Sequence, residues 1–234
     1  MNRPVAPPRR ALLVIAKRPA PGQTKTRLTP PLPSEQASRL YECFLRDTLD
    51  VARAVPGVRR YVHFAPRDAG DYFERLAPDF DLRPQVGESL GPRLDQVLTA
   101  CLSDGFDQAV VMDSDSPSLP ADYVASAFDR LEEADVVLGP CEDGGYYLIG
   151  LNRPQPRLLR EVSMSTPNVL RDTLALAEQA RLRVSLLPAW YDVDTAQELA
   201  RLDGDLVARA SGTAPQTRQY LARLAQPSKG GAGR

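Results

Sequence analysis

The sequence is poor in several residue types, and each shortage argues against a class of protein. Its three cysteines are an odd number and lie far apart without the paired spacing of a zinc site, so neither a disulfide framework nor a zinc site is expected. Its only histidine, His63, falls in a predicted strand and is given no catalytic role. No segment approaches the ~20 apolar residues of a membrane span, so membrane insertion is not expected.

Charge of one sign is also missing. With 29 basic and 30 acidic residues the formal net charge is -1, so no global field attracts nucleic acid or an anionic membrane surface. Any anion that the protein binds must therefore meet a local cluster of cations. The apolar run at residues 11–16 is too short for a signal peptide and ends at Lys17, so we expect a cytoplasmic protein. The oligomeric state stays open.

Short apolar runs alternate with longer segments of helical period, which favours crossover units on a mostly parallel sheet and hence an α/β fold. Strands are expected at residues 11–16, 60–64, 82–86, 109–112, 135–139, 146–151 and 184–187. Helices are expected at residues 35–54, 90–102, 121–131 and 167–180, and another opens with the capping-box pair Thr195 and Glu198. Residues 10–226 are expected to form a single domain, between a flexible start at residues 1–9 and a disordered tail at residues 227–234.

A loop rich in cations, KRPAPGQTKTRL at residues 17–28, directly follows the first expected strand. Because prolines preset backbone angles and glycine permits a tight turn, its backbone N–H groups and its cations can face one anion. Lys and Arg both suit phosphate oxygens, although the spacing of a Walker loop is absent. The predicted nucleotide- and phosphate-binding residues are Lys17, Arg18, Gly22, Thr24, Lys25 and Arg27, together with Arg93 in a later loop.

The choice of cation in this loop favours a binding role over a merely solvated loop. The chain contains 26 Arg and only three Lys, yet Lys17 and Lys25 both fall within these twelve residues. A chain that otherwise uses Arg for surface charge therefore places ammonium groups here. For Arg93 a solvated charge remains an equal explanation.

Two Asp-x-Asp units follow predicted strands. Asp113 and Asp115 leave the apolar strand at residues 109–112, and Asp192 and Asp194 follow a late extended segment. Mg²⁺ and Mn²⁺ prefer oxygen ligands and often use one or two carboxylates together with substrate phosphates. Each unit alone is also ordinary turn or cap chemistry, but two units at the edge where ligands bind fit one metal site. The predicted metal ligands are Asp113, Asp115 and Asp194, of which Asp115 and Asp194 are preferred.

Paired glycines and tyrosines at residues 142–150 join two apolar strands. The glycines allow a backbone approach that a Cβ would block, which suits a sugar or an acceptor, although a simple hairpin also favours Asp-Gly. Asp143 is a candidate general base or acceptor ligand. Thr166 suits an anion at a helix start, but its capping role is sufficient by itself. The predicted acceptor-binding residues are Gly144, Gly145, Tyr146, Ser165 and Thr166.

Four of these segments, in this order, resemble the DUF2064 family of glycosyltransferase-like proteins. They are the basic loop, Asp115-Ser116-Pro117, DGGYYLIGL at residues 143–151 and YDVDT at residues 191–195, and the resemblance covers residues 10–204. The family is similar to the GT-A, or nucleotide-diphospho-sugar transferase, fold. That similarity implies a three-layer Rossmann-like sheet, a nucleotide bound by the first loop and Mg²⁺ or Mn²⁺ held by the Asp after the central strand. Family members often have Gly in place of Asp113 and an aromatic residue in place of Met164.

Three functions are compatible with these residues. The leading hypothesis is a metal-dependent glycosyltransferase, in which Lys25 and Arg27 neutralise the leaving group of a nucleotide-diphospho-sugar and a small-molecule acceptor hydroxyl attacks the anomeric carbon. The alternative is nucleotidylyl transfer from an NTP to a phosphorylated small molecule, with release of pyrophosphate. The density of cations favours this alternative, because a triphosphate carries more charge than a diphosphate sugar. A non-catalytic nucleotide-binding protein ranks third.

Overall fold

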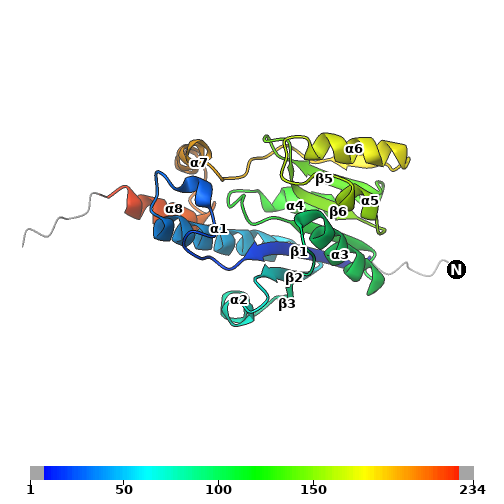
Figure 1. Ribbon diagram of the computed structural model, residues 1–234, viewed down its shortest axis with the longest axis horizontal. Helices are drawn as coiled ribbons and strands as arrows, with labels where there is room; N and C mark the ends of the chain where they lie inside the picture. Colours follow the sequence, from blue (N-terminus) through cyan, green and yellow to red (C-terminus); the bar gives the residue numbers. More distant parts are fainter. Residues whose placement is uncertain (1–7, 227–234) are drawn as a thin grey trace, which may run out of the picture.

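One seven-stranded sheet organises the chain, in the order β3-β2-β1-β4-β6-β5-β7 (Figure 1). The computed structural model describes residues 8–226. Every pair of neighbouring strands is parallel except the two pairs that contain β6. The mostly parallel sheet that the sequence predicts is therefore confirmed. The strands are β1 (Arg10–Lys17), β2 (Val58–Ala65), β3 (Asp81–Pro84), β4 (Gln108–Met112), β5 (Val136–Pro140), β6 (Tyr146–Leu151) and β7 (Val184–Leu186).

The reversed direction of β6 follows from a short connection. Only residues 141–145 lie between β5 and β6, whereas a crossover to a parallel neighbour needs a dozen residues or more. The two strands therefore pair as an antiparallel hairpin, with the Asp-Gly-Gly segment in its turn.

Helices and loops fill the connections between the other strands. The α-helices of the described residues are α1 (Ser34–Ala54), α2 (Gly70–Leu76), α3 (Leu90–Ser103), α4 (Ala121–Arg130), α5 (Pro156–Arg160), α6 (Val169–Gln179), α7 (Ala196–Ala208) and α8 (Pro215–Leu224). A short 3-10 helix, η1 (Thr26–Leu28), ends the basic loop.

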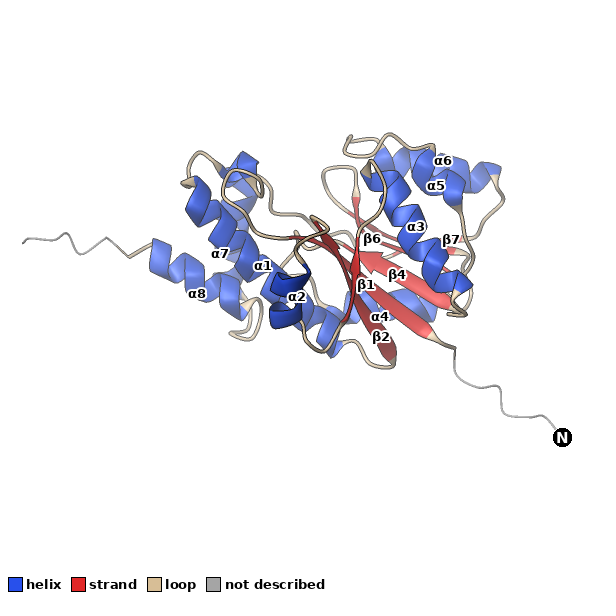
Figure 2. Cartoon of the chain, turned by 60° about the horizontal axis from the view of Figure 1, so that its bottom comes forward, coloured by secondary structure: helices blue, strands red, loops and turns tan. Residues whose placement is uncertain are grey.

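Alternate residues of β1 face two different layers of helices. Leu12 and Val14 belong to a buried cluster that includes residues of α1, α4, α7 and α8. Ala11 and Leu13 belong to a second cluster that includes residues of α3, α5 and α6. Figure 2 shows α3, α5 and α6 gathered on one side of the strands. The period of two along each strand thus produces a three-layer α/β/α arrangement, as predicted.

Two local differences from the expected elements have identifiable causes. α6 begins at Val169 rather than at residue 167, because Thr166 Oγ1 donates to the carbonyl of Ser163 (2.9 Å) and closes a turn ahead of the helix. The unexpected helix α8 is anchored by a distant group: both oxygens of Asp47, on α1, accept N–H groups from the first turn of α8 (3.0 and 2.8 Å). A cap from 170 positions away leaves no local sequence signal.

The ends of the chain bear on two expectations. Arg9, which we counted with the flexible start, donates its N–H to Asp107 Oδ2 (2.7 Å). The expectations for residues 1–7 and 227–234 concern positions outside the described residues. Within residues 8–226, no helix combines the length and the apolar character that crossing a membrane requires.

Candidate active site

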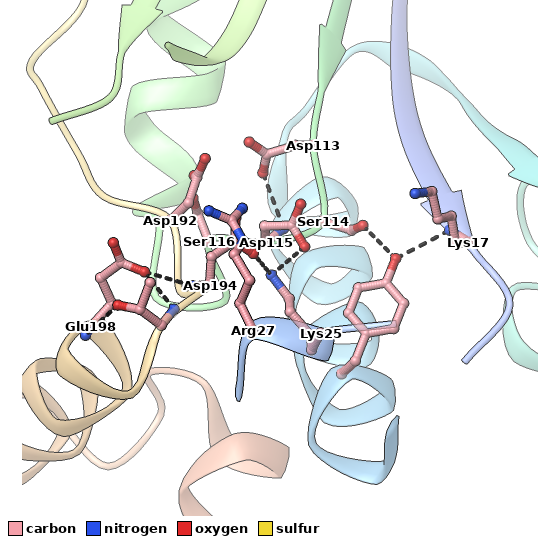
Figure 3. Close-up of polar contacts among 12 residues, drawn as sticks. Lys17, Lys25, Arg27, Asp113, Ser114, Asp115, Ser116, Asp192, Asp194 and Glu198 are labelled. Atoms are coloured by element: carbon pink, nitrogen blue, oxygen red, sulfur yellow. Dashed lines mark hydrogen bonds and ion pairs between the residues drawn. The ribbon is translucent and has the colours of Figure 1, made fainter. Parts of the chain in front are cut away.

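Three segments that are far apart in the sequence meet at one edge of the sheet (Figure 3). β1 and β4 pair in parallel with Val14 opposite Met112, so the basic loop and the first acidic turn leave the sheet side by side. The second acidic segment is tied to the first, because the N–H of Val193 donates to the carbonyl of Asp115 (3.0 Å). The acidic and basic segments thus share one site.

Lys25 lies at the centre of this meeting point. Its Nζ is 2.5 Å from Asp115 Oδ1 and 2.7 Å from Asp194 Oδ1, and its side chain is only 3% exposed. The Arg27 guanidinium, which is largely exposed, reaches the other oxygen of Asp194. A cation of the basic loop, Lys25, therefore contacts the aspartate after the central strand, Asp115, directly.

The surroundings of Lys25 hold an unfavourable backbone conformation. Its φ of 50° lies in the left-handed region, which costs a residue with a Cβ about 1–2 kcal/mol. The rings of Tyr41 and Phe44 on α1 lie 5.9 and 5.6 Å from its Nζ, within the range of a cation–π contact. The ion pairs and the two rings thus fix the ammonium in place against the strain of its backbone.

In this cluster, opposite charges and hydrogen bonds together shift the pKa values more than burial does. Burial by itself would lower the pKa of the Lys25 ammonium, but the charges of Asp115 and Asp194 and their hydrogen bonds raise that pKa above its ordinary value. Burial opposes ionisation of Asp194, yet the Lys25 ammonium and the Arg27 guanidinium hold the pKa of that carboxyl below its ordinary value. Lys25 and Asp194 are therefore both charged at neutral pH.

The other member of each acidic pair accepts hydrogen bonds from neutral donors. Asp113 Oδ1 accepts the N–H of Asp115 (3.1 Å), and Asp192 Oδ1 accepts from Ser116 Oγ (2.6 Å) and Cys141 Sγ (3.3 Å). Burial, and then the neighbouring carboxylates, raise the pKa of Asp113 well above its usual range and that of Asp192 to about 6. We call Asp115 and Asp194 the outer pair and Asp113 and Asp192 the inner pair.

Tyr41 is a site residue that the sequence did not single out. Its hydroxyl accepts the N–H of Lys17 (3.1 Å) and shares a hydrogen bond with Ser114 Oγ (2.9 Å). Because Ser114 separates Asp113 from Asp115, this buried tyrosine links the start of the basic loop to the acidic turn. Burial raises the pKa of Tyr41 to about 12, so the hydroxyl stays neutral. Its place on the buried face of an expected helix was the only signal in the sequence.

A cavity of about 660 Å³ opens over these groups. Its volume falls within the usual range for small-molecule sites. Part of its wall is apolar, from Ile15, Leu90, Leu94 and Met164, and the inner-pair residue Asp192, which we had left out of the predicted site, also lines it. The predicted site residues that line the cavity are Lys17, Thr24, Lys25, Arg27, Asp113, Asp115, Asp143, Gly145, Tyr146, Ser165, Thr166 and Asp194.

Arg18, Gly22, Arg93 and Gly144 are not part of this cavity wall. Arg18 lies 3.9 Å from Asp71, and Arg93 Nε donates to the carbonyl of Gly87 (2.8 Å). Gly22 is an exposed turn residue with a φ of 71°. These three residues lie outside the cavity wall, and their role in phosphate binding stays a prediction.

Part of the backbone of the basic loop is hydrogen-bonded within the loop itself. The N–H groups of Gln23 and Thr24 donate to the carbonyl of Ala20 (3.1 and 3.2 Å), and the N–H of Ala20 donates to Thr24 Oγ1 (3.3 Å). These groups close a turn within the loop. The N–H groups of Ala20, Gln23 and Thr24 are therefore not available to an anion, and anion binding by the rest of the loop stays a prediction.

Gly144 is required by the hairpin rather than by a ligand. Its φ is 90°, and a Cβ at this position would lie 2.1 Å from the carbonyl oxygen of Pro167. The backbone approach that we attributed to an acceptor is thus made to the segment ahead of α6. Asp143 Oδ1 accepts the N–H of Gly145 (2.9 Å) within the same turn and remains exposed at the cavity wall.

The outer pair fits half of a site for a divalent metal ion. One oxygen of Asp115 and one of Asp194 face the single point that the Lys25 ammonium occupies. Within the described part of the chain, no group of three or more His, Cys, Asp or Glu side chains is arranged to hold a metal ion. Mg²⁺ commonly takes one or two carboxylates and completes its shell with water and substrate phosphates. The residues present fit that mode of binding and not an all-protein cage.

Comparison with known sequences identifies a family and a relative of this chain. The model of a family described as "Uncharacterized protein conserved in bacteria (DUF2064)" matches residues 48–166. The chain is also 30% identical over 214 residues to the 2-phospho-L-lactate guanylyltransferase of Methanothermobacter thermautotrophicus. That match covers 88% of this chain and 89% of the relative.

Solved structures share the fold. A protein named as a nucleotide-diphospho-sugar transferase, from Desulfovibrio desulfuricans G20, is 31% identical with a TM-score of 0.81, and the match covers 90% of this chain and 97% of that one. Rv0371c of Mycobacterium tuberculosis H37Rv, in complex with manganese, is 19% identical with a TM-score of 0.50, over 83% and 97% of the two chains. At that identity the second likeness shows the fold alone.

Proposed function

The chain belongs to the DUF2064 family, and we propose that it is a nucleotidyltransferase that couples an NTP to a phosphorylated small molecule and releases pyrophosphate. The two relatives with about 30% identity are both named as transferases. The name of one of them makes GTP and a phosphorylated 2-hydroxy acid the first substrates to test.

One observation carries the proposal: the cations of the first loop and the carboxylates of two distant segments face one cavity. Lys25 contacts Asp115 and Asp194 directly, and Arg27 contacts Asp194. A nucleoside triphosphate presents phosphate oxygens to cations and, bound together with a divalent ion, presents that ion to carboxylates. The site supplies both kinds of partner within reach of each other.

Each group then has a role in binding or positioning. Lys17, Lys25 and Arg27 bind the triphosphate, and Asp115 and Asp194 hold the Mg²⁺ or Mn²⁺ ion that accompanies it. When bound, that ion offsets the charge that develops on the departing pyrophosphate. Gly145, Tyr146, Ser165 and Thr166 line another part of the wall and receive the acceptor, while the exposed carboxylate of Asp143 contacts its polar groups.

Glycosyl transfer, the leading hypothesis from the sequence, becomes the second candidate. The relative named as a guanylyltransferase favours nucleotidylyl transfer, whereas the name of the Desulfovibrio protein refers to a nucleotide sugar. The two reactions share the nucleotide and the metal ion and differ in the bond that breaks. That bond is the α-phosphorus–oxygen bond in one case and the anomeric carbon–oxygen bond in the other.

The products distinguish these reactions. We would incubate the protein with Mg²⁺ and each NTP, together with phosphorylated 2-hydroxy acids, and measure pyrophosphate. A parallel series with nucleotide-diphospho-sugars would measure nucleoside diphosphate. Pyrophosphate that depends on the acceptor supports the proposal, whereas nucleoside diphosphate from the sugar series replaces it with glycosyl transfer. A nucleotide that raises the melting temperature without forming product over hours would favour the non-catalytic binding protein.

A further inference from the structure

The site contains a contact that nucleotide binding does not explain. Lys25 buries its ammonium between the outer-pair carboxylates, with only 3% of the side chain exposed. The two positive charges of Lys25 and Arg27 cancel the two negative charges of Asp115 and Asp194. In this arrangement the cluster offers a triphosphate no net attraction.

The ammonium also stands where a metal ion would stand. The two carboxylate oxygens lie 2.5 and 2.7 Å from Lys25 Nζ, and Mg²⁺ requires its oxygen ligands at about 2.0–2.1 Å. An ion bound to both oxygens would therefore lie well within contact distance of the nitrogen. Two cations cannot occupy such neighbouring points, so the ammonium and the metal ion exclude each other.

We propose that Lys25 is an internal plug of the metal site: its ammonium occupies the outer pair in the free enzyme, and a divalent ion must displace it. This inference rests on the proposed function for the identity of the metal ligands. Displacement would release the ammonium toward the cavity, where it binds phosphate. Metal and nucleotide would then bind cooperatively. The metal ion takes the two carboxylates from Lys25, and the nucleotide offers its phosphate oxygens to the released ammonium.

The backbone of Lys25 is consistent with a contact that is made and broken. Its left-handed φ of 50° is held by side-chain contacts to the outer pair and to two aromatic rings. Loss of the ion pairs would remove the strongest of those contacts. Relief of the backbone strain would then offset part of the free energy needed to move the ammonium.

The first test measures binding of Mn²⁺ alone, without nucleotide, to the full chain. Removal of the plug in Lys25→Met should tighten Mn²⁺ binding at least ~10-fold, equivalent to about 1.4 kcal/mol. Lys17→Met is the matched control, because it removes the same charge from the cavity wall at a residue that forms no ion pair with Asp115 or Asp194. The control should change the affinity less than about 3-fold. Equal affinities for the two variants, weaker binding to Lys25→Met than to the wild type, or no Mn²⁺ binding to any of the three proteins would each overturn the plug.

A second measurement uses the wild-type chain and does not depend on a variant that folds. The chain has only three lysines, so an amine-reactive acetylating reagent followed by peptide mass spectrometry follows Lys25 individually. Without metal Lys25 should react slowly, and Mn²⁺ should accelerate its labelling several-fold relative to Lys17 in the same molecule. An unchanged ratio of the two labelling rates would overturn the plug. If these results hold but no NTP is turned over, the proposed function fails and the plug stands.

Discussion

The outer and inner carboxylate pairs have the same composition and opposite surroundings. Asp115 and Asp194 each contact the Lys25 ammonium, whereas the hydrogen bonds to Asp113 and Asp192 come from a backbone N–H, a hydroxyl and a thiol. Both acidic segments leave extended backbone, where alternate side chains point to opposite sides. Every second position therefore faces the cation, while its partner lies among neutral donors, where burial raises the pKa of its carboxyl.

The largest expected effect is the loss of catalysis when the outer pair loses a carboxylate. Asp115→Asn should lower kcat/KM for nucleotidylyl transfer by about 10³-fold, because a neutral amide replaces a charge placed at the phosphates. Steady-state kinetics with saturating Mg²⁺ measure this loss. Asp122→Asn, an exposed change of the same type at the start of α4, is the control and should leave turnover unchanged. Full activity of Asp115→Asn would remove this residue from the metal site.

The next prediction concerns the pH dependence of stability, to which His63 and the inner pair contribute with opposite signs. Burial, together with the charge of Arg83, lowers the pKa of His63 to about 4, so below pH 6.5 the unfolded chain binds a proton that the folded chain refuses. The stability that comes from His63 is therefore lost as pH falls from 6.5 toward 4. The raised pKa of Asp192 works in the opposite direction, because the folded chain retains a proton up to about pH 6 and loses that stability as pH rises.

Removal of the histidine should make the contribution of the inner pair visible. Between pH 4.5 and 6.5, the free energy of unfolding of the wild type should rise by roughly 2–3 kcal/mol relative to that of His63→Phe. The variant itself should become less stable as pH increases over this window. Urea unfolding at several pH values, with a chelator present, measures both trends. Parallel pH profiles for the two proteins would contradict the assignment.

A smaller effect is a loss of affinity for the NTP that is not accompanied by a comparable loss of stability. The Arg27 side chain is 71% exposed, so its ion pair with Asp194 contributes less than about 1 kcal/mol to folding. Arg27→Gln should nevertheless raise the KM for the NTP about 10-fold, because the guanidinium faces the phosphates. The matched control is Arg171→Gln, a similarly exposed arginine paired with Asp172. It should change neither KM nor the melting temperature.

The smallest effect is a difference in the free energy of unfolding between a variant of the inner pair and a variant of the outer pair. In metal-free protein at pH 7, Asp113→Asn should raise the free energy of unfolding by about 1 kcal/mol, because it removes a carboxyl whose ionisation is opposed by burial and by two neighbouring carboxylates. Asp115→Asn should lower the same quantity, since it leaves Lys25 with one partner. Chemical denaturation measures the two changes. A shift of the same sign in both variants would mean that the pairs do not differ in the way their contacts indicate.

The sequence predicted the elements around the site better than the contacts within it. The strands before Lys17 and Asp113 were predictable because each is a short apolar run, and parallel strands bring their carboxyl ends to one edge. The capping box at Thr195 and Glu198 was also predictable, because it is a local motif, and both of its hydrogen bonds are present. The helix α8 was missed because its cap comes from Asp47 on a distant helix.

The loops show where prediction from residue type ends. Four cations in one loop look equivalent in the sequence, yet Lys25 is buried on two carboxylates while Arg18 lies near Asp71, outside the cavity wall. Gly144 looked like a place for a ligand, but its free space is filled by the carbonyl of Pro167. These outcomes depend on the direction in which each side chain leaves its loop, and periodicity does not encode that direction.

By itself, the sequence determined the alternation of strands and helices, and therefore which segments reach the ligand edge of the sheet. Patterns of apolar residues and local caps act over a few positions, so they can be read one segment at a time. Only the tertiary structure decided that one lysine joins two aspartates, the farther of them 169 positions away. Such a contact is decided by ångström-scale orientation between segments that no local pattern relates.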